Sequence, residues 1–179
     1  LETPIPTATT TTTTGKITGI YDKGKGALVV IEAITTRDGG KPGCMSEFGV
    51  CLRGEGGFGG GPGPAATNEA PKRAPDKTVE TPTLTHQALL YRLSGDKNPL
   101  HADPGFAKMG GFDKPILHGL CTFANVGRAV LQAYADDDPT RFRSIRVRFA
   151  RPVMPGETII TEMWQEAAAG MVVAAKAEE

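Results

Sequence analysis

Residues 115–135, PILHGLCTFANVGRAVLQAYA, combine helical spacing with apolar side chains on almost every face. Pro115 is predicted to open this helix, and the aspartates at 136–138 are predicted to end it. Because a helix that is apolar all round must be buried, we expect a sheet to wrap around it on several sides. The apolar positions are Ile116, Leu117, Leu120, Phe123, Ala124, Val126, Val130, Leu131 and Tyr134.

The sequence after this helix alternates between apolar and polar residues, as strands with one buried face do. Residues 142–153, FRSIRVRFARPV, are predicted to form the first strand, with its apolar side chains toward the core and arginines on the other face. Residues 158–166 and 170–177 are predicted to be two further strands. A long helix followed by consecutive strands favours an α+β fold with an antiparallel sheet around the helix.

The N-terminal part of the chain also favours extended structure. Six consecutive threonines, residues 9–14, prefer a strand because Thr is β-branched, and a low-complexity linker is the alternative. Residues 15–36 form two extended runs around a turn at 22–26, and residues 44–54 add another run after a turn at 39–43. We expect a small antiparallel sheet here.

Residues 54–64, GEGGFGGGPGP, are rich in glycine and proline, and the polar sequence up to residue 82 continues that trend. This composition is typical of a linker. We therefore expect a partial N-terminal unit at 1–60, a linker at 61–82 and a C-terminal unit at 83–179. GEGGFGG could also be a phosphate-binding loop, but it lacks the Lys and Ser or Thr of that motif, which favours a turn.

Composition excludes several classes of protein. Lys plus Arg equals Asp plus Glu at 20 each, so we expect no nucleic-acid partner, which would require an excess of positive charge. No run of about 18 apolar residues predicts a membrane span, and the first 15 residues do not resemble a signal peptide. Three cysteines without a secretory signal indicate reduced thiols.

A polar loop precedes the apolar helix. HQALLYRLSG is predicted to be a helix capped by Thr83 or Thr85 and ended by Gly95, and Asp103 is predicted to cap a short helix that begins at Pro104. The loop between these helices contains the pattern D-x-N-x-x-H at 96–101, with a proline that excludes a smooth helix. Rigidly held loops of this kind often carry catalytic groups.

Asp96, Asn98 and His101 offer the groups for acid–base chemistry on one water molecule. A neutral imidazole accepts a proton from the water, a carboxylate handles a proton at a second substrate atom, and the amide holds either one in place. The pattern alone is a weak signal, because Asp and Asn are also turn formers and His101 could merely hydrogen-bond to them.

The wider segment is more specific. YRLSGDKNPLHADPGFAKMGGFDKPILHGLCTFA resembles the signature of the hydratase 2 family, the MaoC-like (R)-specific enoyl-CoA hydratases, and especially the hydratase 2 units of peroxisomal multifunctional enzymes of type 2. YDKGKGALV, GEGGFGG, RFARPVMPGET and TEMW extend the resemblance over nearly all of residues 15–179. The resemblance implies a hot-dog fold, and a double hot dog whose N-terminal unit is incomplete here, because no long apolar helix precedes Gly56 and the C-terminus stops about one strand early.

The resemblance also implies an activity and its residues. The family adds water reversibly to trans-2-enoyl-CoA to give (3R)-3-hydroxyacyl-CoA in fatty-acid β-oxidation or related metabolism. By this resemblance Asp96 is the acid–base carboxylate, His101 activates the water, Asn98 assists, and the Gly119 N–H stabilises the thioester oxygen. Other residues are implied to contact the CoA ester: Lys23, Arg92 and Phe149.

The resemblance further implies no cofactor and no metal, a homodimer that covers an open sheet edge, and a peroxisomal location in a eukaryote or a cytoplasmic one otherwise. The sequence does not end in a Ser-Lys-Leu address. A non-catalytic acyl-CoA-binding module and a thioester hydrolase are the alternatives, and nothing in the sequence aims a water at the thioester carbonyl.

Several residues have plainer interpretations. A zinc site at His118, Cys121, His101 and Asp103 is disfavoured because no paired metal-ligand spacing exists. Cys121 is predicted to pack in the core, His118 to be structural at a helix start, and His86 to lie on the surface. An arginine row either holds CoA phosphates or forms a solvated face or dimer surface: Arg143, Arg146, Arg148 and Arg151.

Overall fold

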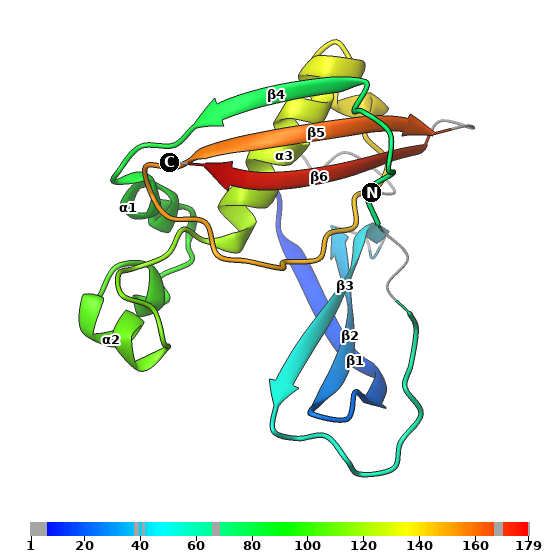
Figure 1. Cartoon of the computed structure of the whole chain (residues 1–179). Helices are drawn as coiled ribbons and strands as arrows, with labels where there is room; N and C mark the ends of the chain where they lie inside the picture. The colour runs from blue at the N-terminus through cyan, green and yellow to red at the C-terminus, as the bar shows by residue number, and fades with distance from the viewer. Residues whose placement is uncertain (1–6, 38–39, 41, 66–68, 167–169, 179) are drawn as a thin grey trace. The chain divides into compact units, whose positions relative to one another are not determined.

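The computed structural model describes residues 7–37, 40, 42–65, 69–166 and 170–178. The chain divides into two compact units, Leu1–Thr67 and Asn68–Glu179 (Figure 1). The first unit contains β1 (Thr11–Asp22), β2 (Gly26–Arg37) and β3 (Pro42–Arg53). The second contains β4 (Lys77–Pro82), α1 (Gln87–Tyr91), η1 (Arg92–Ser94), η2 (Pro99–His101), α2 (Pro104–Met109), α3 (Gly119–Tyr134), η3 (Pro139–Arg141), β5 (Thr158–Glu166) and β6 (Gly170–Glu178).

The first unit is an antiparallel sheet in the order β1-β2-β3. The last four threonines of the run, Thr11–Thr14, belong to β1, and the hydroxyls of Thr13 and Thr35 on the neighbouring strand lie 2.9 Å apart. The structure therefore confirms the strand interpretation over the linker. The small antiparallel sheet predicted for this part of the chain is also confirmed.

The glycine-rich segment of the first unit is folded around a carboxylate. Asp22 accepts hydrogen bonds from the backbone N–H groups of Gly24, Gly57 and Gly59 at 2.8, 2.9 and 2.8 Å. These bonds, the one from Gly57 above all, lower the pKa of Asp22. The amides that a phosphate would need are thus bonded to the chain's own side chain, which supports the turn interpretation of GEGGFGG.

The second unit is an antiparallel sheet in the order β4-β5-β6 with α3 packed against it (Figure 1). Every second residue of β5 is fully buried, namely Ile159, Thr161 and Met163, which is the pattern of a strand with one covered face. Ile159 packs with Cys121 of α3 in a core cluster that also contains Ala88 and Leu117. The strands predicted at 158–166 and 170–177 are confirmed, and a sheet packs on the long helix. The helix is less enclosed than its apolar sequence suggests, since Cys121 and Ala129 are buried but Leu120 is half exposed.

Four features of secondary structure predicted from the sequence are wrong. Residues 77–82, assigned to the linker, form β4 and pair with β5. Neither Thr83 nor Thr85 caps α1, whose N-cap is His86. The Thr83 hydroxyl instead donates to the Glu157 carbonyl and accepts from the Gly156 N–H. The apolar helix begins at Gly119 rather than at Pro115, since the Leu117 N–H bonds to the Val153 carbonyl instead of continuing a helix.

The fourth concerns residues 142–153, which form no strand. Among the described residues they pair with no neighbouring strand, and a strand needs a partner for its backbone groups. Ile145, Val147 and Phe149 are exposed rather than buried. The alternation of apolar and charged residues here therefore does not correspond to a buried face.

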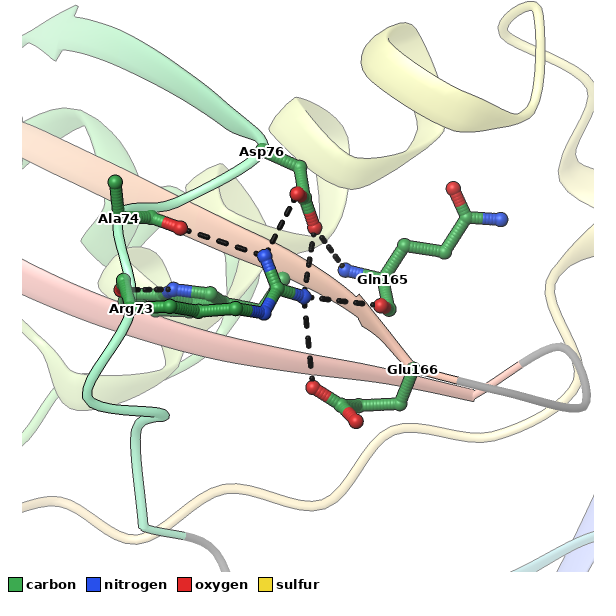
Figure 2. A network of polar contacts seen from close by, with 6 residues as sticks. Arg73, Ala74, Asp76, Gln165 and Glu166 are labelled. Atoms are coloured by element: carbon green, nitrogen blue, oxygen red, sulfur yellow. Dashed lines mark hydrogen bonds and ion pairs between the residues drawn. The ribbon is translucent and has the colours of Figure 1, made fainter.

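A polar network fastens the start of the second unit to the end of β5 (Figure 2). Arg73 donates two hydrogen bonds, of 2.7 and 3.0 Å, to the Asp76 carboxylate and a third to the Gln165 carbonyl. Asp76 also accepts from the Gln165 N–H at 2.8 Å, and Trp164 donates its indole N–H to the Arg73 carbonyl. The guanidinium of Arg73, together with the Gln165 N–H, lowers the pKa of Asp76.

This network predicts a pH-dependent stability. The pKa of Asp76 is lower in the folded chain than its ordinary value of 3.8, so its contribution is present above that value and is lost as the pH falls through the folded pKa. Asp76→Asn is expected to lower the melting temperature at neutral pH, and the gap to the unsubstituted protein should close below about pH 4. Melting curves across pH test this, with the exposed Asp113→Asn as the control. A gap that stays constant with pH would contradict the assignment.

In the described part of the chain, no helix has both the length and the apolarity to cross a bilayer.

Candidate active site

The D-x-N-x-x-H loop is shaped by local backbone bonds. Gly95 ends η1 in a left-handed conformation with φ of 117°, which an L side chain would rarely adopt. Asn98 then accepts a hydrogen bond from the Leu100 N–H at 3.0 Å and caps η2, in which Pro99 holds one of the first positions. The last residue of η2 is His101, which this turn directs inward to 8% exposure.

One hydrogen bond shows which ring nitrogen of His101 carries a hydrogen. Its Nδ1 lies 2.9 Å from the Ile116 carbonyl, in the segment that leads into α3. A carbonyl oxygen only accepts, so Nδ1 carries a hydrogen, and in the neutral form of the ring Nε2 keeps a lone pair. The backbone N–H of His101 donates to the Asn98 carbonyl at 3.2 Å, but its imidazole bonds to Ile116 and not to the side chains of Asp96 or Asn98. The ring therefore does more than support the turn.

Asp96 and His101 lie close enough to act on one ligand. One ligand atom from each of Asp96, His101 and His118 lies within 4.8 Å of the others. A water that makes two hydrogen bonds of about 2.8 Å at a tetrahedral angle bridges atoms about 4.6 Å apart. The separation therefore suits one shared water. The backbone N–H of Asn98 donates a hydrogen bond to the Asp96 carboxylate at 3.2 Å, which helps to hold that carboxylate in place.

His118 is fully buried beside these groups and was predicted only to be structural. Its Nε2 donates to the Asp96 backbone carbonyl at 3.1 Å, and its ring stacks on His101 with centroids 3.8 Å apart. The Tyr91 ring packs against it at 4.9 Å. Burial lowers the pKa of His118 and outweighs the opposing effect of the hydrogen bond to the Asp96 carbonyl, so the neutral ring predominates near pH 7.

The start of α3, directly after His118, provides a backbone N–H donor next to these side chains. His118 is the N-cap and Gly119 is the first helical residue, so the Gly119 N–H has no acceptor within the helix. Among the described residues it has no other partner either. A Cβ added at Gly119 would lie 3.1 Å from the Phe149 ring, so this ring covers the glycine. The positive end of the helix dipole favours negative charge here.

The same three side chains also have the spacing of a cation site, but their bonds argue against one. Nδ1 of His101 and Nε2 of His118 are used in backbone hydrogen bonds. The two rings are nearly parallel, with 27° between their planes, so their remaining lone pairs do not converge in the way that imidazoles around one ion do. Asp103, named with the zinc alternative, instead caps α2 by accepting from the Phe106 N–H.

The remaining predicted residues are distributed over both units. Arg92 lies beside the site, since its charge acts on His118, and Phe149 covers Gly119. Lys23 belongs to the first unit, where its ammonium donates to the carbonyls of Pro62 and Pro64. Its contact with a CoA ester stays a prediction.

Cys121 is buried in the core cluster, and burial raises the pKa of its thiol. The thiolate that a nucleophile requires is therefore disfavoured, which agrees with the packing role predicted for this residue. His86 is exposed, as predicted.

The sequence alone does not indicate that His118 contacts the other residues of the site. A histidine directly before the first residue of an apolar helix looks like a helix-start residue. Its stack on His101 joins residues 17 positions apart and arises only from the loop geometry.

Comparison with known proteins adds two family matches. The family described as MaoC like domain matches residues 66–177. The family described as MFE-2 hydratase 2 N-terminal domain matches residues 1–54. The first match begins within two residues of the division between the two units, and the second lies wholly in the first unit.

Curated relatives and solved structures agree with these matches. The chain is 49% identical over 168 residues to a "Probable enoyl-CoA hydratase 2" of Dictyostelium discoideum, covering 90% of this chain and 56% of that protein. It is 49% identical over 157 residues to the "Peroxisomal multifunctional enzyme type 2" of Mus musculus, covering 84% of this chain and 21% of that protein. The chain thus spans little more than half of the first relative and about a fifth of the second.

The crystal structure of a MaoC-like dehydratase from Phytophthora capsici superposes with a TM-score of 0.92 at 41% identity, covering 99% of this chain and 63% of that one. The full-length peroxisomal multifunctional enzyme type 2 of Drosophila melanogaster superposes with a TM-score of 0.84 at 37% identity, covering 98% of this chain and 34% of that one. The predicted resemblance is confirmed by both kinds of comparison.

Proposed function

The chain belongs to the MaoC-like hydratase family and has its α+β hot-dog fold, and from this we propose that it adds water reversibly to trans-2-enoyl-CoA, giving (3R)-3-hydroxyacyl-CoA. The names of its relatives include enoyl-CoA hydratase 2 and 3-hydroxyacyl-thioester dehydratase, which describe the two directions of this reaction. The proposal places the chain among the hydro-lyases.

One observation carries the proposal. Asp96 and a ring nitrogen of His101 lie within 4.8 Å of each other, a separation that lets both groups contact one water. His101 is buried and held by Ile116, while Asp96 keeps access to solvent. The arrangement supplies a ring nitrogen that can accept a proton and a carboxylate close enough to act on the same water.

The proposed reaction uses these groups as follows. Nε2 of His101 accepts a proton from the water while the water oxygen bonds to C3 of the enoyl group. The electron pair of the double bond shifts toward the thioester oxygen, where the Gly119 N–H and the helix dipole stabilise the negative charge. The proton taken up by His101 passes to the Asp96 carboxylate, which delivers it to C2 on the same face, so the elements of water are added and both groups are restored.

Product analysis tests the proposal. The protein is incubated with trans-2-enoyl-CoA thioesters of short, medium and long acyl chains, and the products are separated by chiral chromatography. We expect the 3R product. A 3S product would contradict the proposed arrangement, and binding without turnover would favour the non-catalytic acyl-CoA-binding alternative. Release of free CoA would favour thioester hydrolysis.

We also propose a role in peroxisomal acyl-CoA metabolism and a homodimeric state. The support for the compartment is that relatives from mouse and Arabidopsis thaliana carry the word peroxisomal in their names. The support for the dimer is that each three-stranded sheet has open edges, which pairing would cover. Fractionation of cells and sedimentation analysis test these two proposals separately.

A further inference from the structure

His118 holds three parts of the candidate site at once. Its ring stacks on His101 at 3.8 Å, its Nε2–H binds the Asp96 carbonyl at 3.1 Å, and its backbone caps the helix that begins at Gly119. In the described part of the chain, no other side chain combines a hydrogen bond to Asp96 with a ring contact to His101. The three groups assigned to the reaction are therefore tied together through one residue.

His118 is not placed to react itself. It is 0% exposed, and its Nδ1 is buried without a hydrogen-bond partner among the described residues. Because Nε2 donates to a carbonyl, Nδ1 carries only a lone pair, and burial lowers the pKa of the ring. A neutral ring of this kind neither delivers nor removes a proton near pH 7.

The contacts of His118 restrain motions that the other bonds leave free. The single hydrogen bond from His101 to Ile116 fixes the direction of the imidazole but allows rotation about that bond. A parallel ring at 3.8 Å blocks that rotation on one side. Asp96 follows the left-handed Gly95 on a loop, and the bond to its carbonyl holds this loop against the helix start.

We propose that His118 is a positioning residue for the hydration reaction, which fixes the His101 ring by stacking and the Asp96 backbone by a hydrogen bond so that both side chains meet the same water. This inference rests on the proposed function. A misplacement of about 1 Å in a catalytic group can cost about 10² in rate, so loss of either contact should lower kcat more than it weakens substrate binding.

Two substitutions separate the two contacts. His118→Phe keeps a flat ring beside His101 and Tyr91 but cannot donate to the Asp96 carbonyl. His118→Gln keeps an N–H donor near the position of Nε2 but removes the ring. Each is expected to lower kcat by about tenfold or more with KM changed less than about twofold, and His118→Ala by about 10². His86→Gln, at the exposed histidine, is the matched control and should leave both constants unchanged.

The outcomes are distinguishable. If the unsubstituted protein does not hydrate enoyl-CoA, the proposed function fails before any variant is compared. If it does, and the Phe and Gln variants retain its kcat, the positioning role is overturned. A rise in KM at constant kcat would also overturn it. Melting curves identify variants that lose activity only because they unfold.

A measurement on the unsubstituted protein needs neither activity nor a stable variant. Nitrogen NMR of imidazole-labelled protein distinguishes the tautomers of its three histidines, with His86→Gln to assign the exposed one. We expect the His118 ring to be neutral, with hydrogen on Nε2 and none on Nδ1, between about pH 7 and 8. A His118 ring that carries hydrogen on Nδ1 in this range would overturn the inference.

Discussion

The His101→Asn variant is expected to lose about 10² to 10⁴ of the hydration kcat while keeping its fold. The asparagine amide can still donate to the Ile116 carbonyl, which His101 binds at 2.9 Å. It has no lone pair that could accept a proton from water at the position of Nε2. The loss in kcat therefore measures the contribution of His101 as a base and not that of its hydrogen bond to Ile116.

The companion substitution is Asp96→Asn. It keeps an oxygen that can accept from the Asn98 N–H, which now bonds Asp96 at 3.2 Å. It removes the carboxylate that handles the proton at C2, so we expect a loss of at least about 10² in kcat. Steady-state kinetics on trans-2-enoyl-CoA give both values. A folded Asp96→Asn variant at full rate would remove the role assigned to Asp96.

The second large effect is expected at Gly119. Proline is favoured at the first position of a helix, and His118 before it has φ −59° and ψ 132°, an extended conformation that a following proline tolerates. Gly119→Pro therefore removes the backbone N–H with little change to the helix. If that N–H binds the thioester oxygen in the transition state, kcat should fall by about 10² to 10³.

Gly119→Ala is the matched control for the bulk of the new ring. Its Cβ would lie 3.1 Å from the Phe149 ring, as the proline Cβ would, but it keeps the N–H. Phe149 is 55% exposed, so its ring has room to move aside. The informative quantity is the ratio of kcat for the alanine and proline variants. A ratio near one would show that the Gly119 N–H does not contribute to catalysis.

The sequence predicted most of what local rules decide. The D-x-N-x-x-H loop, the cap at Asp103 and the stop at Gly95 follow from residues that form bonds within a few positions of themselves, and the structure contains them. The β5 and β6 strands follow the turn at Pro155-Gly156, and the structure places them where predicted. The long helix was found because its apolar residues repeat at helical spacing.

The errors arise where distant residues decide the outcome. Thr83 has the side chain of a helix cap, but its hydroxyl bonds to Glu157 and Gly156, more than 70 residues away. Residues 142–153 have strand periodicity but no partner strand in the described part of the chain. Residues 77–82 looked like a linker next to a proline-rich segment, yet they pair with β5. The contact between His101 and His118 likewise depends on three-dimensional packing.

The most direct test of the central claim is a double-mutant cycle of Asp96→Asn and His101→Asn, read as kcat on trans-2-enoyl-CoA. Two groups that act on one water work as a unit, so the double variant should be no more than a few-fold slower than the slower single variant. Losses that multiply, so that two variants slowed about 10² each give a double variant slowed about 10⁴, would show that the groups act independently and would contradict the account.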